Sequence, residues 1–346
     1  MLRSRTTTSG LALALFVALA TITGCGGGSR DGNEPAHPAT DQPAASTVTL
    51  VTHDSFAMDP DVLKDFETSS GYSLTVLTVG DAGTLTNQLV LTKDAPLGDA
   101  FFGVDNTLSS RLTDNNVTTD LVPVTRGDVC LNYDAAWFAD KGITPPTSLT
   151  DLTTETYQDL LVTINPATSS PGLAFLLTTI DTFGTDGFNG KGWTDYWQAL
   201  MANGAIISSD WSDAYFAEFS GAGEGGTRPI VVSYSSSPAF TVDANGDSTT
   251  GALLDACFRQ TEYAGVLAGA SNPDGAAALM EFLVSDEFQR LIPEQMYVYP
   301  ASDATELPPD WARLAPLAEH PVIMDPAEIA ANRQAWLDAW ATATAS

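Results

Sequence analysis

The sequence predicts an α/β fold with a largely parallel β-sheet. Short β-branched and apolar runs, typical of strands, alternate along the chain with segments whose apolar residues recur at helical spacing. Polar residues follow the strands directly, and in open α/β sheets ligands bind at these carboxyl ends. With 346 residues, the chain is long enough for two lobes of ordinary domain size.

The expected elements follow this alternation in chain order. Strands are predicted at 48–52, 72–79 and 100–105, with helices at 60–69, 84–93 and 107–115. A strand at 130–133 is expected to cross to a second lobe, where strands at 160–164, 205–207 and 230–232 alternate with helices at 173–182 and 193–202. A strand at 257–267 would return, followed by a helix at 274–284 that continues through 287–292, a loop or edge strand at 297–300 and a last helix at 326–342.

The segment 230–240 carries the most informative local pattern. An apolar strand runs into Tyr234 and three serines, and Ser237 is expected to cap a helix that has Pro238 in its first turn. The same order of strand, Ser-Ser-Pro and helix recurs at 165–172. Each segment alone also suits an ordinary β–α turn, and the repetition favours ligand binding.

The N-terminal 46 residues predict export and tethering. Two arginines precede an apolar run at 11–22, which is too short to span a bilayer and is typical of a signal peptide, here 1–24. The run ends in Ile-Thr-Gly-Cys, which resembles a bacterial lipobox with Cys25 as the lipidated residue; plain secretion with an incidental cysteine is the alternative. Residues 25–46 are expected to form a flexible tether. The mature protein would then be extracytoplasmic, either anchored by lipid to the outer face of the cell membrane or periplasmic.

Charge and cysteine content narrow the function further. The formal net charge is -29, and it becomes -31 when 1–24 is removed, because that segment carries two Arg and no acid. Such a field repels nucleic acid and favours cationic ligands, although a salt-adapted or merely soluble surface is an equally open interpretation. Cys130 and Cys257 are the remaining cysteines, and outside the cytoplasm they favour one disulfide over two buried free thiols.

Signatures of catalysis are scarce. The histidines are His37, His53 and His320, and the sequence has no nucleophile elbow, zinc-protease motif, Cys/His metal spacing or phosphate loop. We therefore expect no catalytic residue, no metal and no cofactor, although the many acids leave a carboxylate pair open. The strand ends instead carry aromatic, hydroxyl and acidic residues. Aromatic faces and carboxylates suit a flat cation, and the Ser-Ser-Pro helix starts suit an anion such as phosphate.

The order of motifs along the chain is more specific than any one of them. The motifs are Thr-His-Asp-Ser-Phe at 52–56, Asp81 before a helix, Phe-Gly-Val-Asp-Asn at 102–106, the segments 165–172 and 233–240, Asp-Trp-Ser-Asp-Ala-Tyr at 210–215, the segment 288–300 and Arg-Gln-Ala-Trp at 333–336. Together they resemble the thiamine-binding proteins of bacterial ABC importers over nearly the whole mature chain. The resemblance implies a two-lobed type II periplasmic-binding-protein fold, in which each lobe is a mostly parallel sheet flanked by helices and the crossing strands form a hinge.

The resemblance also implies a ligand site. Its predicted residues are His53, Asp81, Ala82, Ser169, Ser170, Trp211, Tyr234, Ser235, Ser236, Ser237 and Tyr297. Asp81 would accept hydrogen bonds from thiamine or offset its charge, and Trp211 and Tyr234 would contact its rings. The family has Tyr, Gly and Trp where this chain has His53, Ala82 and Tyr297, which leaves the preferred form (thiamine, its monophosphate or its diphosphate) open. Asp128 is an additional acid expected near the cleft.

The implied partners are thiamine or its phosphates and a cognate ABC permease. The protein would be a monomer that touches the membrane only through its lipid anchor and binds no nucleic acid. The expected domains are a first lobe at 47–129 and 262–300, a second lobe at 130–261 and a C-terminal helical segment, 301–346, packed on the second lobe. Alternatives are a binder of polyamine or ferric iron and, from another class, a secreted hydrolase. Tyr234 stands alone among serines, whereas related iron binders are expected to use adjacent tyrosines.

Overall fold

The computed structural model describes residues 46–223 and 225–345. The expected signal peptide, the lipidated Cys25 and nearly all of the tether lie outside the described residues. Within the described residues, no helix is both long and apolar enough to cross a membrane.

The strands of the described chain join into one sheet. They are β1 (Thr47–Thr52), β2 (Ser73–Thr78), β3 (Ala100–Asp105), β4 (Val122–Asp134), β5 (Leu161–Ile164), β6 (Ile206–Ser208), β7 (Ile230–Tyr234), β8 (Thr250–Val266) and β9 (Tyr299–Pro300). Their order is β2-β1-β3-β8-β4-β7-β5-β6, and β9 pairs with β4.

Helices flank this sheet in both lobes. They are α1 (Pro60–Ser70), α2 (Ala82–Leu91), α3 (Ser109–Asp114), α4 (Ala135–Lys141), α5 (Ser170–Phe183), α6 (Trp193–Ala202), α7 (Pro273–Leu283), α8 (Asp286–Gln289), α9 (Ile292–Met296), α10 (Trp311–Leu314) and α11 (Pro326–Thr344). Short helical turns are η1 (Leu149–Thr153), η2 (Glu155–Tyr157), η3 (Asp213–Glu218), η4 (Ser220–Ala222) and η5 (Ser237–Ala239).

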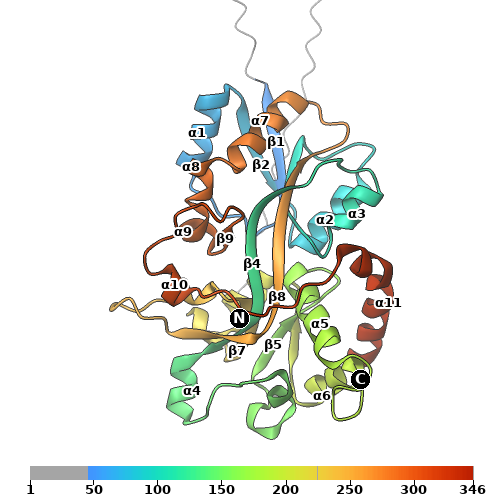
Figure 1. Ribbon diagram of the computed structural model, residues 1–346, viewed down its shortest axis with the longest axis vertical. Coiled ribbons are helices and arrows are strands. Elements are labelled where there is room, and N and C mark those ends of the chain that lie inside the picture. Colours follow the sequence, from blue (N-terminus) through green and yellow to red (C-terminus); the bar gives the residue numbers. More distant parts are fainter. Residues whose placement is uncertain (1–45, 224, 346) are drawn as a thin grey trace, which may run out of the picture. The chain divides into compact units, whose positions relative to one another are not determined.

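Two long strands connect two groups of parallel strands, which confirms the expected fold class. β1 pairs in parallel with β2 and β3 in the first lobe, and β5 pairs in parallel with β6 and β7 in the second. β4 and β8 run antiparallel to each other through both lobes, as Figure 1 shows. Both are much longer than the sequence predicted, because polar and charged residues such as Thr125 and Glu262 interrupt their apolar pattern.

The expectations for the two Ser-Ser-Pro segments have different outcomes. The segment at 165–172 does start a helix: Ser169 is the N-cap of α5, and its Oγ accepts a hydrogen bond from the Gly172 N–H at 3.4 Å. The helix expected after Ser237 is wrong, since only the single turn η5 forms there. The Ser237 Oγ instead accepts a hydrogen bond from the Tyr234 N–H at 3.2 Å and lies 2.8 Å from the Ser233 Oγ.

The helix at 274–284 also ends earlier than expected. Val284 follows the last residue of α7, and Ser285 caps a separate helix, α8, by accepting a hydrogen bond from the Phe288 N–H at 3.3 Å. A third short helix, α9, follows with Pro293 in its first turn. The chain therefore bends repeatedly between 284 and 297, and these bends bring the end of α9 toward the strand ends of the sheet.

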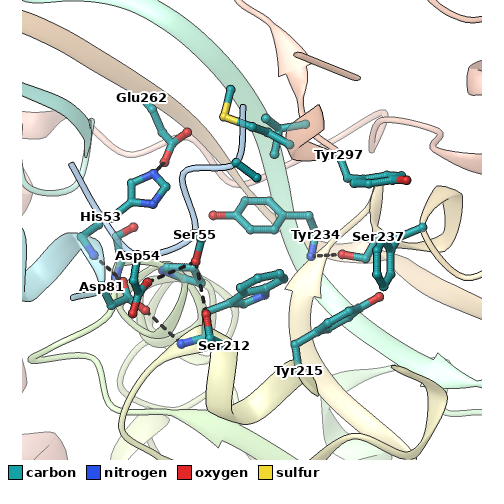
Figure 2. A pocket seen from close by; sticks show the side chains of 18 of the residues that line it. His53, Asp54, Ser55, Asp81, Ser212, Tyr215, Tyr234, Ser237, Glu262 and Tyr297 are labelled. Carbon is teal, nitrogen blue, oxygen red and sulfur yellow. Dashed lines mark hydrogen bonds and ion pairs between the residues drawn. The ribbon is translucent and has the colours of Figure 1, made fainter. Parts of the chain in front are cut away.

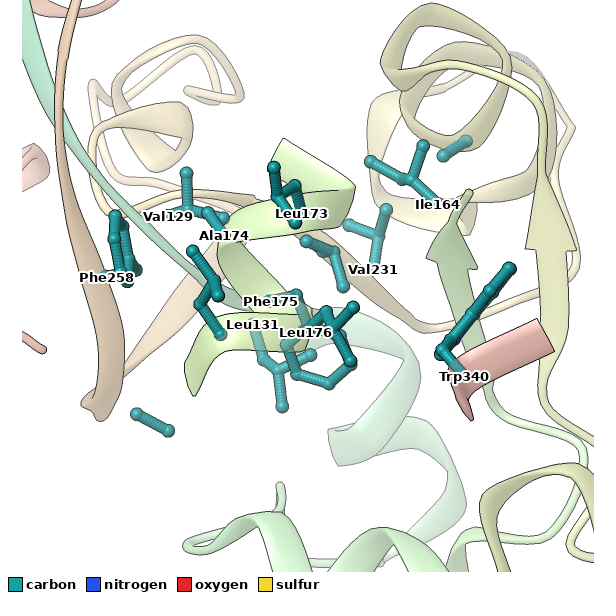
Figure 3. Close-up of a cluster of buried hydrophobic side chains, with 14 of the residues drawn as sticks. Val129, Leu131, Ile164, Leu173, Ala174, Phe175, Leu176, Val231, Phe258 and Trp340 are labelled. Carbon is teal, nitrogen blue, oxygen red and sulfur yellow. The ribbon is translucent and has the colours of Figure 1, made fainter. Parts of the chain in front are cut away.

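The apolar helix α5 forms the centre of the larger core. Leu173, Phe175 and Leu176 are at most 1% exposed. Figure 3 shows them between side chains of the crossing strands on one side and Ile164 and Val231 on the other. Because α5 is buried on nearly every side, its N-terminal residues are held in a fixed position at the carboxyl edge of the sheet.

Two further contacts join parts of the chain that are distant in sequence. Cys130 on β4 and Cys257 on β8 form a disulfide between the crossing strands, with their sulfurs 2.03 Å apart. The C-terminal helix α11 packs against α6 and also against α3, so it contacts both lobes. Trp340 of α11 meets Trp197 of α6 edge to face, with ring centroids 5.8 Å apart.

Candidate functional site: a cleft between the strand ends

A cavity of about 300 Å³ lies where the strand ends of the two lobes meet, beside the end of α9. This volume is at the lower end of the range for small-molecule sites. Figure 2 shows side chains from both lobes converging on it, with the Tyr234 ring near the centre. The lining residues are His53, Asp54, Ser55, Ala57, Asp81, Ala82, Ser170, Pro171, Trp211, Ser212, Tyr215, Phe216, Tyr234, Ser237, Phe240, Glu262, Gln295, Met296, Tyr297 and Val298.

Most of the predicted ligand residues lie together in this lining. The structure brings together His53, Asp81, Ala82, Ser170, Trp211, Tyr234, Ser237 and Tyr297. Since these residues come from segments spread over more than 240 positions, their convergence follows from the fold and not from local sequence.

Three predicted serines do not line the cavity. Ser169 is buried as the N-cap of α5. The Ser235 N–H donates to the Asp128 carbonyl at 2.8 Å, and its side chain is fully buried. The Ser236 Oγ donates to the Tyr297 carbonyl at 2.6 Å. Successive side chains point in different directions where a strand enters a turn, so neighbouring serines cannot all face one cavity.

Asp128, the acid expected near the cleft, does not line the cavity. Its carboxylate is fully buried and ion-paired with the Arg259 guanidinium. It also accepts a hydrogen bond from the Ala318 N–H at 2.8 Å. This carboxylate therefore links β4 to Arg259 of β8 and to the backbone at Ala318. It is not available to a ligand in the cleft.

Several lining residues were not predicted from the sequence. Asp54 and Ser55 adjoin His53, and Tyr215 follows Trp211 by four positions, so proximity to predicted residues was a usable signal. Glu262 carried no such signal, because it lies in the middle of β8 and reaches the cavity only through the pairing of β8 with β3.

Aromatic rings form one wall of the cavity, and hydrogen bonds hold them in place. The Trp211 and Tyr215 rings stack with centroids 5.0 Å apart at 14°, and Tyr234 meets Trp211 edge-on at 6.4 Å. The Trp211 Nε1–H donates to the Ser233 Oγ at 3.0 Å, and the Tyr234 hydroxyl donates to the Gln260 Oε1 at 3.0 Å. The wall is therefore largely preformed.

Tyr297, which follows α9, adds a further aromatic ring to the lining of the cavity. Its ring packs edge-to-face on Phe240, with centroids 5.0 Å apart. Its backbone is left-handed, with φ of 52°, a conformation that residues other than glycine adopt rarely. The hydrogen bond from Ser236 to its carbonyl helps to hold that conformation. Ser236 thus supports the site without lining it.

The Asp81 carboxylate joins the two lobes at the edge of the cavity. Its Oδ1 accepts a hydrogen bond from the Ala82 N–H at 2.6 Å, which caps α2, and lies 3.4 Å from the Ser170 nitrogen of α5. Its Oδ2 accepts from the Trp211 N–H at 3.0 Å. Burial raises the pKa of Asp81 to about 6, against the lowering effect of the Trp211 N–H, the Ser169 hydroxyl and His53.

His53 and Glu262 form a buried ion pair next to Asp81. The His53 Nε2 lies 3.4 Å from the Glu262 Oε1. Burial alone would lower the pKa of His53, but Glu262, with help from Asp81 and Asp54, raises it. The imidazole packs closely on Gly103, where a Cβ would lie only 1.9 Å from its Cδ2, so this position requires glycine.

The cavity has an acidic and aromatic character. Three carboxylates line it, those of Asp54, Asp81 and Glu262, together with the single imidazole of His53. No Lys or Arg occurs among the described lining residues. Carboxylates and ring faces in one partly dry pocket attract a flat organic cation through charge and cation–π interactions.

Comparison with known proteins agrees with this fold. The family model of the bacterial extracellular solute-binding proteins matches residues 104–318, more than half of the chain. The chain belongs to this family. It is therefore an extracytoplasmic solute-binding protein, of the kind that supplies an ABC importer.

Individual relatives match most of the chain. The thiamine-binding periplasmic protein of Escherichia coli (strain K12) is 30% identical over 317 residues, which cover 86% of this chain and 93% of the relative. The protein of the same name from Salmonella typhimurium is 29% identical over 317 residues, which again cover 86% of this chain and 93% of the relative. A solved structure of a periplasmic thiamin binding protein superposes with a TM-score of 0.76 at 27% identity, covering 86% of this chain and 96% of that one. These relatives are named as binding proteins and not as enzymes.

Proposed function

We propose that the cavity binds thiamine and that this protein is the thiamine-binding component of its importer. The observation that carries the proposal is the lining: aromatic rings with three carboxylates and, among the described residues, no Lys or Arg. Thiamine has a flat aminopyrimidine ring and a thiazolium ring with a permanent positive charge. Such a ligand can use ring faces and carboxylates together. The relatives named as thiamine-binding proteins support the same ligand.

Each wall then has a role in binding. Trp211 and Tyr234 are proposed to contact the rings of the ligand, and Asp81 and Glu262 to offset its positive charge. Ser170 and Ser237 offer hydroxyl groups to the polar ends of the ligand. His53 is proposed to act mainly through its ion pair with Glu262, which keeps one carboxylate partly neutralised.

The same geometry favours unphosphorylated thiamine over the diphosphate. The N-terminus of α5 is a typical anion site, but the Asp81 carboxylate already lies 3.4 Å from its Ser170 nitrogen. Without a described Lys or Arg in the lining, a diphosphate would meet three carboxylates, and the one imidazole there, His53, is already paired with Glu262. The monophosphate is expected to bind with intermediate affinity.

Ligand-driven closure of the two lobes is the proposed mechanism of capture. Contacts between the lobes already surround the cavity: the Thr84 N–H donates to the Thr168 carbonyl at 3.1 Å, and the Ser55 and Ser212 Oγ atoms lie 3.5 Å apart. A ligand that touches both lobes binds the closed form more tightly and shifts the population toward it. We propose the lobe boundaries 47–129 with 262–300 and 130–261, with 301–346 as the C-terminal segment, because the crossing strands change lobe near these positions.

We further propose that the protein is a monomer anchored by a lipid on Cys25 and that it delivers thiamine to a cognate permease. The lipobox pattern at 22–25 and the polar segment after it support the anchor. Ferric iron is not proposed, because Tyr234 is followed by three serines, whereas related iron binders are expected to use adjacent tyrosines.

Calorimetric titration of the ligand-stripped mature protein tests the proposal. Thiamine is expected to give saturable one-to-one binding, the monophosphate weaker binding, the diphosphate weaker binding still, and spermidine none. Saturable binding of spermidine without binding of thiamine would instead identify a polyamine binder. Chromatography of the ligand after incubation provides the check on catalysis, since a binding protein returns thiamine unchanged.

A further inference from the structure

A second cavity lies away from the thiamine cleft, between the C-terminal helix and the first lobe. Figure 1 shows α11 next to α2 and α3. The cavity is lined by residues of these three helices and of the loop after β5, and it shares no residue with the cleft. Its lining residues are Asn87, Arg111, Asn165, Ala167, Arg333, Gln334, Leu337, Asp338, Trp340 and Ala341.

The charge of this lining is opposite in sign to that of the whole protein. The chain has only 14 Lys and Arg against 43 acids, yet two of its arginines, Arg111 and Arg333, meet at this cavity. The lining includes one acid, Asp338, whose Oδ1 already accepts a hydrogen bond from the Gln334 side chain at 2.9 Å. The cavity therefore carries a net positive charge on a strongly negative protein.

Neither guanidinium has an acidic partner in an ion pair within the part of the chain that the structure describes. The Arg111 Nη1 donates to the Asn87 Oδ1 at 2.7 Å. The Arg333 Nε–H is buried and has no hydrogen-bond acceptor among the described residues. Trp340, which is 7% exposed, likewise has an Nε1–H without an acceptor there. Two buried donors at one cavity thus lack acceptors.

Such an arrangement is unfavourable while the cavity holds only water or nothing. Burial and the nearby Arg111 lower the pKa of Arg333 to about 10, with a smaller opposing effect from Asp105, so Arg333 is still protonated at neutral pH. A buried donor without an acceptor and two neighbouring like charges both cost stability. An anion between the guanidiniums would remove both costs, and guanidinium groups match oxyanions with paired hydrogen bonds.

We propose that this cavity is a binding site for a small oxyanion, held between Arg111 of α3 and Arg333 of α11. The side-chain amides of Asn87 and Asn165 complete the lining with further polar groups. Phosphate and carboxylate groups share the required chemistry. Because α11 also packs on α6 of the second lobe, an anion bound here ties α3 to a helix that contacts both lobes.

Thermal unfolding of the mature protein with added anions tests this site. The probes are inorganic phosphate and acetate, each compared with chloride at equal ionic strength. Wild type is expected to show a saturable rise in melting temperature with at least one of the two, and the more effective probe distinguishes a phosphate site from a carboxylate site. Arg333→Gln and Arg111→Gln should each raise, at least tenfold, the anion concentration that gives half of the full rise in melting temperature. Arg290→Gln, which removes an exposed arginine outside the cavity, should keep it.

Two further measurements separate this site from the cleft. Without phosphate or acetate, Arg333→Gln should melt at or above wild type, because it removes a half-buried charge that has no acidic partner and a buried Nε–H that has no acceptor among the described residues. Tyr234→Ala, which changes the cleft, should retain the full anion response. Equal anion responses in wild type, Arg333→Gln and Arg111→Gln would overturn the proposal, as would loss of the response in Tyr234→Ala. Calorimetry with thiamine tests the cleft separately, so a failure of one proposal can be told from a failure of the other.

Discussion

The Oδ2 atom of Asp81 accepts a hydrogen bond from the backbone N–H of Trp211 at 3.0 Å, although the two residues belong to different lobes. The same carboxylate caps α2 in the first lobe and lies at the start of α5 in the second. One side chain therefore acts both in the internal structure of a lobe and in the contact between lobes. Its charge also faces the cavity, so its substitution should affect closure and ligand binding together.

Asp81→Asn is expected to weaken thiamine binding by about 1.5–3 kcal/mol, the usual range for a hydrogen bond to a charged group. The amide removes the negative charge and offers a donor to the Trp211 N–H in one of its two orientations. Calorimetry with thiamine measures the change. Asp59→Asn is the matched control, because the Asp59 carboxylate also caps a helix, accepting from the Asp61 N–H at the start of α1, but is exposed and lies outside the cavity. Equal affinities in the two variants would contradict the proposed role of Asp81.

Tyr234→Ala is expected to reduce thiamine affinity by about 1–3 kcal/mol, because a ring in the centre of the cavity is lost. Tyr234→Phe should lose much less, since it keeps the ring and removes only the hydroxyl that donates to Gln260. The comparison separates ring contact from hydrogen bonding. If Tyr234→Ala bound thiamine as tightly as wild type, Tyr234 would not belong to the site.

Thiamine affinity is expected to increase as pH rises from 5 to 8. Burial raises the pKa of Asp81 to about 6 and that of Asp105 to about 7, so these carboxyls ionise only in this range. A bound cation favours their ionised forms, and binding should therefore release protons. Calorimetry in two buffers of different ionisation enthalpy measures that release. Asp81→Asn should reduce it, and a pH-independent wild-type affinity would argue against cation recognition by Asp81.

The unfolding free energy of the ligand-free protein is expected to fall as the pH rises from about 4 to about 7. A raised carboxyl pKa means that the folded state still binds a proton after the unfolded chain has lost it, so stability decreases from about pH 4 to about pH 7. The raised pKa of His53 acts in the same direction at higher pH. The lowered pKa of Glu262 removes stability at acidic pH, below about 4.5. Urea titrations should therefore place maximum stability near pH 4, and a maximum above pH 7 would contradict this balance.

Loss of the disulfide is expected to destabilise the protein without abolishing thiamine binding. Cys130 and Cys257 are 127 positions apart, and closing such a long loop restricts the unfolded chain strongly. Replacing both by Ser should cost about 2–5 kcal/mol, measured by urea unfolding. Neither cysteine lines the cleft, so thiamine affinity of the folded variant should stay near that of wild type. A large loss of affinity at unchanged stability would show that the bond acts on the hinge instead.

Local features of the chain were predictable from the sequence. The strand–helix alternation, the helix start at the Ser-Ser-Pro segment of 165–172 and the apolar character of α5 depend on residues close together in the chain, and the structure has them at the expected places. The motif order was equally readable, and with it the family and eight of the twenty residues that line the cavity. These properties follow from local propensity and from patterns that need no knowledge of distant partners.

The tertiary structure decided which side chains meet. Glu262 reaches His53 only because β8 pairs with β3, and Arg111 meets Arg333 only because α11 packs back on α3. The orientation of Ser235 and Ser236 depends on how the chain turns after β7, where a helix was expected and a single helical turn forms. Long-range pairing and packing set these relationships, and their free energy comes from partners at least 61 residues away, which no local pattern encodes.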